Sequence, residues 1–238
     1  MIHFTGSEAT GRRINVAAAP LLKRVALELG GNNAMIVAPS ATQDLALMAT
    51  VFGAVGTAGQ RCTTTRRLIV HESIYDTVLS TLIKAYKQVE GKIGDPLDPA
   101  NLMGPLNSQG AVQQFLDSIA KAKASGGTVE TGGTAIDRPG NFVLPAIVTG
   151  LKNSDEVVQH ETFAPILYVM KYKTLDEAID MQNGVVDGAH QRAGVIDNIA
   201  ALVDRARAAE VPVVGLMCVP PAGIEPAPFF AFLDKPAA

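Results

Sequence analysis

The sequence predicts an α/β fold with a largely parallel sheet flanked by helices, and three observations support this prediction. The chain has 238 residues, enough for one large domain or two modest ones. Hydrophobic residues make up 47% of it and charged residues 18%, a globular composition. Apolar runs of strand length alternate with longer segments of helical periodicity. Such alternation favours parallel strands covered by helices on both faces.

Strands are expected where short apolar runs end at glycine, proline or polar residues. These runs are residues 1–7, 23–30, 33–39, 66–72, 142–150 and 164–172. Helices are expected where apolar residues recur at helical spacing. These segments are residues 8–18, 40–59, 73–89, 108–124 and a helix that starts at Leu175. The helix over 40–59 opens with Ser40, which could cap it.

The last quarter of the sequence has a different character. Residues 195–206 place apolar side chains on one helical face, and a strand is expected directly after this helix. Residues 217–238 are rich in proline and show no usable period. We therefore expect an irregular or disordered C-terminal tail.

Charge and cysteine usage exclude several classes of function. The formal net charge is −3 and basic residues do not cluster, so nothing points to nucleic acid or an anionic membrane. Two cysteines, Cys62 and Cys218, cannot form a disulfide framework and fit a reducing compartment. No segment has the length of a signal peptide or a membrane span. We expect a cytoplasmic protein.

The histidines do not indicate a metal site. Their spacing matches no common set of metal ligands, and the four are His3, His71, His160 and His190. We therefore expect that the protein binds no metal.

Cys62 is the residue that most invites a chemical interpretation. It lies in the segment VGTAGQRCTTTRRLIV, beyond a predicted helix and ahead of a predicted strand. A free cysteine is commonly a small buried hydrophobe, but Arg61 and Arg66 could raise the local positive potential and favour a thiolate. Glu28, at a strand end beside two glycines, could take a proton from the thiol or from a hydrolytic water. A strand-end glutamate is also commonly just exposed to solvent.

Six segments carry a resemblance to a known family. They are FTGSEATGR, LELGGNNAMIV, VGTAGQRCTTTRRLIVHESIYD, IGDPLDPANLMGPL, RPGNFVLPAIVTGL and ETFAPILYV, in this order over residues 3–178. Their order and spacing resemble the aldehyde dehydrogenase superfamily, and GQRCTTTRR and RPGNFV are most similar to its α-aminoadipic semialdehyde branch. The resemblance implies NAD(P)-dependent oxidation of an aldehyde to a carboxylate through a cysteine thiohemiacetal and a thioester.

The resemblance also implies roles for particular residues. Cys62 matches the nucleophile, Glu28 matches the base that activates water for deacylation, and Arg61 matches an arginine that contacts the substrate carboxylate. The cofactor, NAD or NADP, is expected to contact a turn near the nicotinamide and pyrophosphate and a pair at the nicotinamide ribose and ring. These residues are Gly6 and Ser7 in the turn, and Glu161 and Phe163 in the pair.

The family pattern is incomplete in this sequence. A complete member carries a long segment ahead of FTGS that supplies most of the dinucleotide-binding sheet and an asparagine for the oxyanion hole. We therefore expect a chain truncated at its N-terminus, with an incomplete cofactor site and impaired activity. Exposed sheet surfaces are then expected to favour self-association.

A second resemblance begins where the first one ends. Residues 179–216 resemble the start of an isochorismatase-like cysteine hydrolase, in which Asp180 matches the catalytic aspartate. The sequence then predicts a chimera with four parts: a dinucleotide-binding remnant over 1–30, a catalytic domain over 31–178, the hydrolase-like segment 179–216 and the tail 217–238. Two alternatives to the dehydrogenase stay open, a fragment of such a hydrolase and a non-catalytic fragment that binds or assembles.

Overall fold

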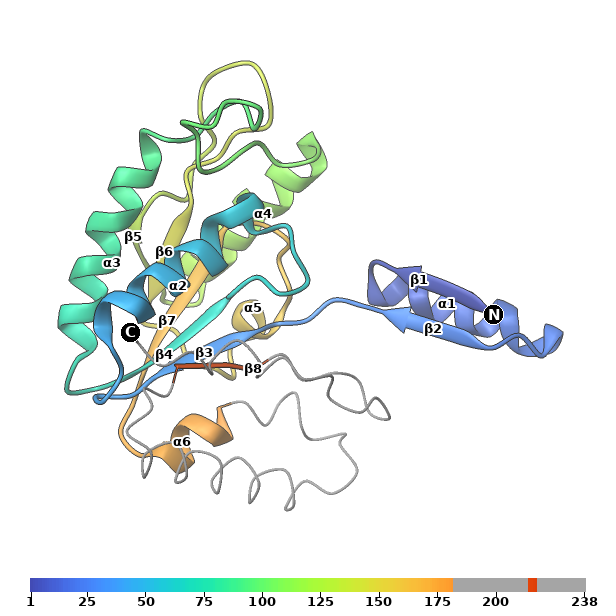
Figure 1. Ribbon diagram of the computed structural model, residues 1–238, viewed down its shortest axis with the longest axis horizontal. Coiled ribbons are helices and arrows are strands. Elements are labelled where there is room, and N and C mark those ends of the chain that lie inside the picture. The colour runs from blue at the N-terminus through green and yellow to red at the C-terminus, as the bar shows by residue number, and fades with distance from the viewer. Residues whose placement is uncertain (182–213, 218–238) are drawn as a thin grey trace, which may run out of the picture.

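The computed structural model describes residues 1–181 and 214–217, and these residues form two sheets and the helices around them (Figure 1). The strands are β1 (Ile2–Thr5), β2 (Val25–Glu28), β3 (Ala34–Val37), β4 (Arg67–His71), β5 (Thr128–Thr131), β6 (Ala146–Thr149), β7 (Ile166–Tyr172) and β8 (Val214–Met217). The helices are α1 (Glu8–Ala18), α2 (Gln43–Val55), α3 (Tyr75–Glu90), α4 (Gln109–Ala124), α5 (Glu156–Gln159) and α6 (Leu175–Asp180), with 3₁₀ turns η1 (Ala19–Leu21) and η2 (Gly56–Gly59).

The larger sheet has six strands in the order β5-β6-β7-β4-β3-β8. Its four central strands are parallel, whereas β5 and β8 pair antiparallel at the two edges. Leu68, Ile69 and Val70 in β4 are fully buried, because a central parallel strand is covered on both faces. The predicted α/β architecture with a largely parallel sheet is therefore confirmed.

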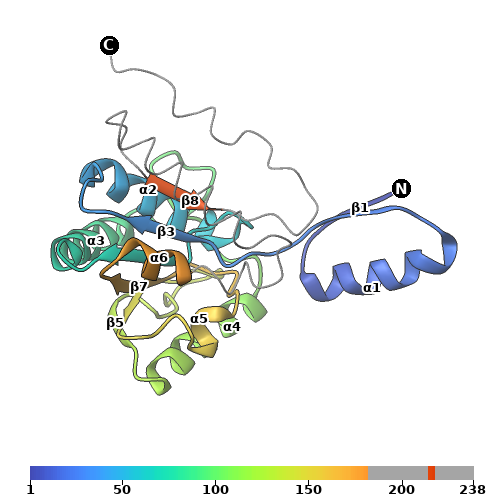
Figure 2. The ribbon, with the colours of Figure 1, turned by 90° about the horizontal axis from the view of Figure 1, so that it is seen from below.

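The smaller sheet contains only β1 and β2, which are parallel and joined through α1. Figure 2 shows this unit lying away from the larger sheet. Ser7 caps α1, since its Oγ accepts a 3.4 Å hydrogen bond from the backbone N–H of Thr10. The backbone N–H of Gly6 donates to the carbonyl of Glu28 at 3.0 Å, so the turn after β1 lies beside the end of β2.

Most predicted elements are present, with differences at their ends. The helix expected over 40–59 begins at Gln43 with Thr42 at its N-cap, so Ser40 does not cap it. Strand β5 and helix α5 are present although no sequence pattern predicts them, and each is only four residues long. The strand expected near the C-terminus is present as β8, while the helix over 195–206 and the tail after Met217 lie outside the described residues.

The described helices give no indication of a membrane span. Within residues 1–181 and 214–217, no helix is both long enough and apolar enough to cross a bilayer.

Candidate active site

Cys62 is exposed in the loop between η2 and β4, as the sequence predicts. The chain reaches this loop through three successive residues with positive φ, Thr57 (55°), Ala58 (52°) and Gly59 (69°). Left-handed backbone is unfavourable for residues other than glycine. The loop therefore depends on surrounding contacts to hold its conformation.

Asn33 provides the first of these contacts. Its side-chain Nδ2 donates to the backbone carbonyl of Cys62 at 2.6 Å and to that of Thr64 at 3.0 Å. Within the loop, the N–H of Arg61 donates to Thr64 Oγ1, and the N–H of Thr64 donates to the carbonyl of Arg61, both at 3.1 Å. Asn33 thus fixes the loop to the start of β3 at Cys62 and Thr64, and the Arg61–Thr64 bonds close the loop around Cys62.

Gln60 ties the same loop to the segment that precedes α4. Its Nε2 donates to the carbonyl of Pro105 at 3.2 Å, and its Oε1 accepts a 2.9 Å hydrogen bond from the N–H of Asn107. Because its side-chain amide both donates and accepts a hydrogen bond, Gln60 holds the loop against a part of the chain that is distant in sequence.

Arg66 lies beneath the loop with only 2% of its surface exposed. Its guanidinium donates to the backbone carbonyls of Gly59 and Arg61, which precede Cys62, at 3.3 and 3.1 Å. It also forms an ion pair with Glu161 at 3.1 Å. Burial lowers the pKa of Arg66 below its ordinary value, while the negative charge and hydrogen bond of Glu161, and to a smaller extent the nearby Cys62, oppose this shift.

Glu161 is partly buried and its carboxylate lies against the backbone of Gly30. A Cβ at Gly30 would overlap Glu161 Oε2, so this close approach requires glycine. Beside Glu161 opens a cleft of about 670 Å³ between α4 and α5. Phe163 is 44% exposed, and its ring centre lies 5.3 Å from the Arg66 guanidinium. The structure thus brings Cys62, Glu161 and Phe163 around one buried arginine.

Glu28 is the last residue of β2 and is exposed. The chain runs from it through Gly30 and Gly31 to the cysteine loop, where a Cβ at Gly31 would lie 3.7 Å from the carbonyl of Cys62. Among the described residues, the Glu28 carboxylate makes no hydrogen bond to Cys62. The segment that follows Glu28 thus lies against the cysteine loop, but the Glu28 side chain makes no hydrogen bond to Cys62.

The remaining predicted residues lie around this centre or apart from it. Arg61 is exposed, and its guanidinium lies 5.5 Å from the centre of the Phe52 ring. Gly6 and Ser7 belong to the β1–α1–β2 unit, at the N-terminus of α1. In the part of the chain that the structure describes, no group of three or more His, Cys, Asp or Glu residues could hold a metal ion.

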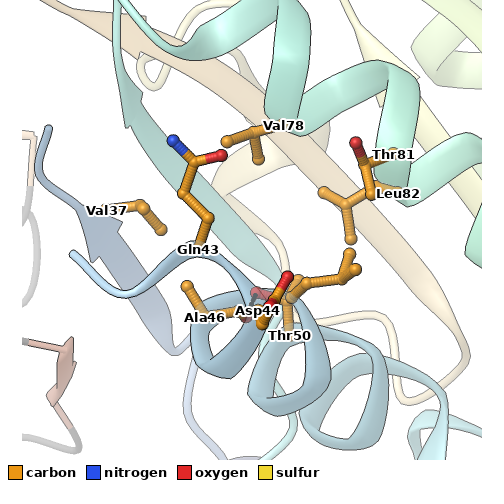
Figure 3. A pocket seen from close by; sticks show the side chains of 9 residues that line it. Val37, Gln43, Asp44, Ala46, Thr50, Val78, Thr81 and Leu82 are labelled. Carbon is orange, nitrogen blue, oxygen red and sulfur yellow. Dashed lines mark hydrogen bonds between the residues drawn. The ribbon is translucent and has the colours of Figure 1, made fainter.

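A second hollow lies at the N-terminal end of α2, whereas Cys62 follows the C-terminal end of this helix. Figure 3 shows the residues that line the hollow. It measures about 90 Å³ and lies between the first turns of α2 and the middle of α3. Its walls are apolar at five of nine residues, and its polar members are Gln43, Asp44, Thr50 and Thr81. It is a packing gap between two helices rather than a reaction site.

Sequence reasoning missed the residues that hold the loop, Asn33 and Gln60, and it treated Arg66 only as a nearby positive charge. The available signal was the pair Arg66–Arg67 at the start of an apolar strand, an unusual place for two arginines. Both are buried, and Arg67 donates two hydrogen bonds to the carbonyl of Asn32 at 3.1 and 2.7 Å.

The fold and the site together define a class of protein, an α/β protein with an exposed cysteine held beside a paired carboxylate. The sequence model of the aldehyde dehydrogenase family matches residues 1–230. The chain belongs to the aldehyde dehydrogenase family.

Relatives within this family agree with that assignment. The chain is 48% identical over 188 residues to the α-aminoadipic semialdehyde dehydrogenase of Bos taurus, a match that covers 79% of this chain and 34% of the relative. It is 47% identical over 188 residues to aldehyde dehydrogenase family 7 member A1 of Pisum sativum, covering 79% and 36%. The chain thus spans about a third of the length of these relatives.

The solved structures show the same fold. A betaine aldehyde dehydrogenase from Staphylococcus aureus in complex with NAD⁺ superimposes with a TM-score of 0.73 at 34% identity. The match covers 76% of this chain and 36% of that one.

The hydrolase alternative is not favoured by these findings. The family match includes residues 179–216, the segment that resembles an isochorismatase-like hydrolase. Asp180 ends helix α6, whereas the hydrolase pattern requires a strand ahead of its aspartate.

Proposed function

We propose that this chain carries the catalytic cysteine segment of an NAD(P)-dependent aldehyde dehydrogenase, with α-aminoadipic semialdehyde as its candidate substrate. The observation that carries the proposal is the exposed Cys62 on a loop held by Arg66 and Glu161. Membership of the family and the identity to α-aminoadipic semialdehyde dehydrogenases support the reaction and the substrate. Turnover is the proposed activity of a protein as long as these relatives, and this chain spans about a third of their length.

The first step is attack by Cys62 on the aldehyde carbon. The thiolate is the reactive form of a cysteine, and the guanidinium of Arg66 lies beside the loop that carries Cys62. The sulfur bonds to the carbonyl carbon and gives a thiohemiacetal, which becomes a thioester once a hydride has left. The exposed position of Cys62 leaves room for a substrate carbonyl.

The residues around Glu161 fit the ribose and ring of a nicotinamide cofactor. Glu161 Oε1 is paired with Arg66, so Oε2 can accept a hydrogen bond from a ribose hydroxyl, and the partly exposed Phe163 offers an aromatic face. Gly6, Ser7 and the N-terminus of α1 suit a phosphate group. When bound, NAD(P)⁺ supplies the hydride acceptor of the reaction.

Glu28 and Arg61 would complete the cycle. A carboxylate such as Glu28 can take a proton from a water that attacks the thioester, which releases the carboxylate product and frees Cys62. Glu28 lies on a segment flanked by glycines, and these allow a close approach to the loop. The exposed guanidinium of Arg61, next to Cys62, can bind the far carboxylate of a semialdehyde substrate.

The test measures the covalent step, which needs only this chain. The full chain is treated with limiting iodoacetamide at neutral pH, and peptide mapping compares the labelling of Cys62 with that of Cys218. We expect Cys62 to react at least about tenfold faster and α-aminoadipic semialdehyde to protect it. Equal labelling of the two cysteines, or no protection by the aldehyde, would refute the nucleophile assignment.

A further inference from the structure

We propose that Arg66 is a positioning residue that couples the cysteine loop to Glu161, so that the charge and position of the Glu161 carboxylate set the reactivity of Cys62. This inference rests on the proposed function, because it deepens the role of the same site. It would give the protein a direct link between the place where the cofactor ribose is expected and the place where the substrate is attacked.

The coupling starts from the hydrogen bonds of one guanidinium group. Arg66 Nη1 donates to the carbonyls of Gly59 (3.3 Å) and Thr162 (2.8 Å), and Nε donates to the carbonyl of Gly31 (3.3 Å). Nη2 donates to the carbonyl of Arg61 (3.1 Å) and to Glu161 Oε1 (3.1 Å). These five bonds use all five donors of the guanidinium.

The bonds reach three separate segments of the chain. Gly31 belongs to the connection between β2 and β3, Gly59 and Arg61 lead directly to Cys62, and Glu161 and Thr162 precede β7. Because the guanidinium is planar and rigid, displacing one of these segments tilts the group and strains its bonds to the others. Arg66 therefore makes the three segments behave as one unit.

The nitrogen Nη2 of Arg66 contacts both the cysteine loop and Glu161. One of its N–H groups holds the carbonyl of Arg61, the residue immediately before Cys62, and the other holds the carboxylate of Glu161. Glu161 keeps 27% of its side chain exposed and borders the open cleft, so a ligand there can engage its second oxygen. A change at Glu161 is thereby transmitted to the loop through a single atom.

The charges of Arg66 and Glu161 determine whether a substitution raises or lowers the reactivity of Cys62. Arg66 is 2% exposed, and the Glu161 carboxylate compensates its positive charge. When that carboxylate is neutralised, more of the guanidinium's positive charge stays uncompensated beside the loop that carries Cys62, and a nearby cation makes a cysteine more reactive. When lysine replaces Arg66, the loop loses the guanidinium's hydrogen bonds to the carbonyls of Gly59 and Arg61, and the remaining ammonium is no longer fixed beside the loop. The two changes should therefore move the reactivity of Cys62 in opposite directions.

Arg67 supplies a matched control. It is the next residue, it is equally buried, and its guanidinium bonds to the carbonyls of Asn32 and Met181 and to the side chain of Asn153. Arg67→Lys therefore tests the loss of a buried guanidinium that does not contact the residues around Cys62.

The experiment compares the iodoacetamide alkylation rate of Cys62 at neutral pH in the full chain and in four variants, with circular dichroism as a check on folding. The variants are Glu161→Gln, Arg66→Lys, the double variant and Arg67→Lys. We expect Glu161→Gln to alkylate about fivefold faster, since it removes one nearby negative charge. We expect Arg66→Lys to alkylate about fivefold slower, since lysine keeps the positive charge but cannot make the guanidinium's hydrogen bonds to the loop. Arg67→Lys should stay within about twofold of the unsubstituted chain.

The double variant distinguishes transmission through Arg66 from a direct effect of Glu161. If the effect passes through Arg66, Glu161→Gln accelerates alkylation much less in the Arg66→Lys background than alone. Additive effects, a slower Glu161→Gln variant, or an equal loss in Arg67→Lys would overturn the proposal. If Arg66→Lys does not fold, a slower or unchanged rate in Glu161→Gln still overturns the proposal.

The outcome for the coupling is separable from the outcome for the proposed function. Ratios between variants test the coupling, whereas the rate of Cys62 relative to Cys218 in the unsubstituted chain tests the nucleophile assignment.

Discussion

The side-chain amide of Asn33 donates a 2.6 Å hydrogen bond to the backbone carbonyl of Cys62. The same side chain reaches the carbonyl of Thr64, and the carbonyl of Asn33 accepts hydrogen bonds from the N–H groups of Arg66 and Arg67 at 3.1 Å. Asn33 is only 8% exposed, so water cannot readily replace these bonds. The start of β3 and the cysteine loop are therefore held as one structural unit.

Replacing Asn33 should release that loop. Asn33→Ala leaves two backbone carbonyls without their donor, and we expect a loss of about 1 to 3 kcal/mol in the free energy of unfolding, measured by urea denaturation. Limited proteolysis should then cut the chain within residues 60–65. Asn101→Ala is the control, because Asn101 donates to the carbonyl of Asp95 at an exposed site. Equal losses in the two variants would show that Asn33 has no special role.

Much of the fold could be predicted from local patterns. The apolar runs of β3, β4 and β7 are continuous because these strands are buried on both faces, and this run length distinguishes them from half-exposed strands. The position of Cys62 after a helix and before a strand followed from the glycines at the end of α2. Such features depend on neighbouring residues, which a sequence displays directly.

The contacts that shape the site could not be predicted in the same way. The bond from Arg66 to Glu161 joins residues 95 positions apart, and no local pattern encodes it. Two adjacent arginines that follow a polar loop suggest a solvated surface, yet both are buried at the start of β4, because backbone carbonyls satisfy their donors. Glu28, in contrast, is exposed, as expected for an ordinary strand end.

Gly59 should not tolerate any side chain. Its φ is +69°, and a Cβ there would overlap the backbone carbonyl group of Ala164, which cannot move without shifting the start of β7. We expect Gly59→Ala to cost on the order of 3 kcal/mol in a thermal or urea unfolding experiment. Gly56→Ala is a close control, since its φ is −52° and the nearest atom to its Cβ would be 3.8 Å away in Phe52. A tolerated Gly59→Ala would contradict this description of the loop.

The exposed face of α2 should promote self-association. Leu45, Met48 and Phe52 lie on one side of this helix and are 45%, 63% and 59% exposed. We propose that the chain associates through this face, so that its sedimentation coefficient rises with concentration. Met48→Lys should suppress the rise, because it places a charge in the middle of the apolar stripe. Leu97→Lys, at an isolated and 89% exposed position, should leave it unchanged; an equal effect would count against a defined surface.

Tyr168 provides a prediction about stability and pH. It lies in β7 and is 3% exposed, and among the described residues its hydroxyl has no hydrogen-bond partner. Burial raises the pKa of Tyr168 to about 12 from the ordinary 10.0. An unpartnered buried hydroxyl is unfavourable, so Tyr168→Phe should raise the free energy of unfolding at neutral pH by about 1 kcal/mol.

The difference in unfolding free energy between Tyr168→Phe and the unsubstituted protein should increase in alkaline solution. Between pH 10 and 12 the unfolded chain loses the Tyr168 proton while the folded chain retains it, so the unsubstituted protein loses stability as pH rises. The variant lacks this ionisation, and the difference in unfolding free energy should grow by up to about 3 kcal/mol across this range, measured by urea denaturation at successive pH values. Tyr172→Phe is the control on the same strand, and it should destabilise the protein because the Tyr172 hydroxyl donates to the carbonyl of Val37 at 3.4 Å. A difference between Tyr168→Phe and the unsubstituted protein that stays constant with pH would mean that the phenol reaches water in the folded state.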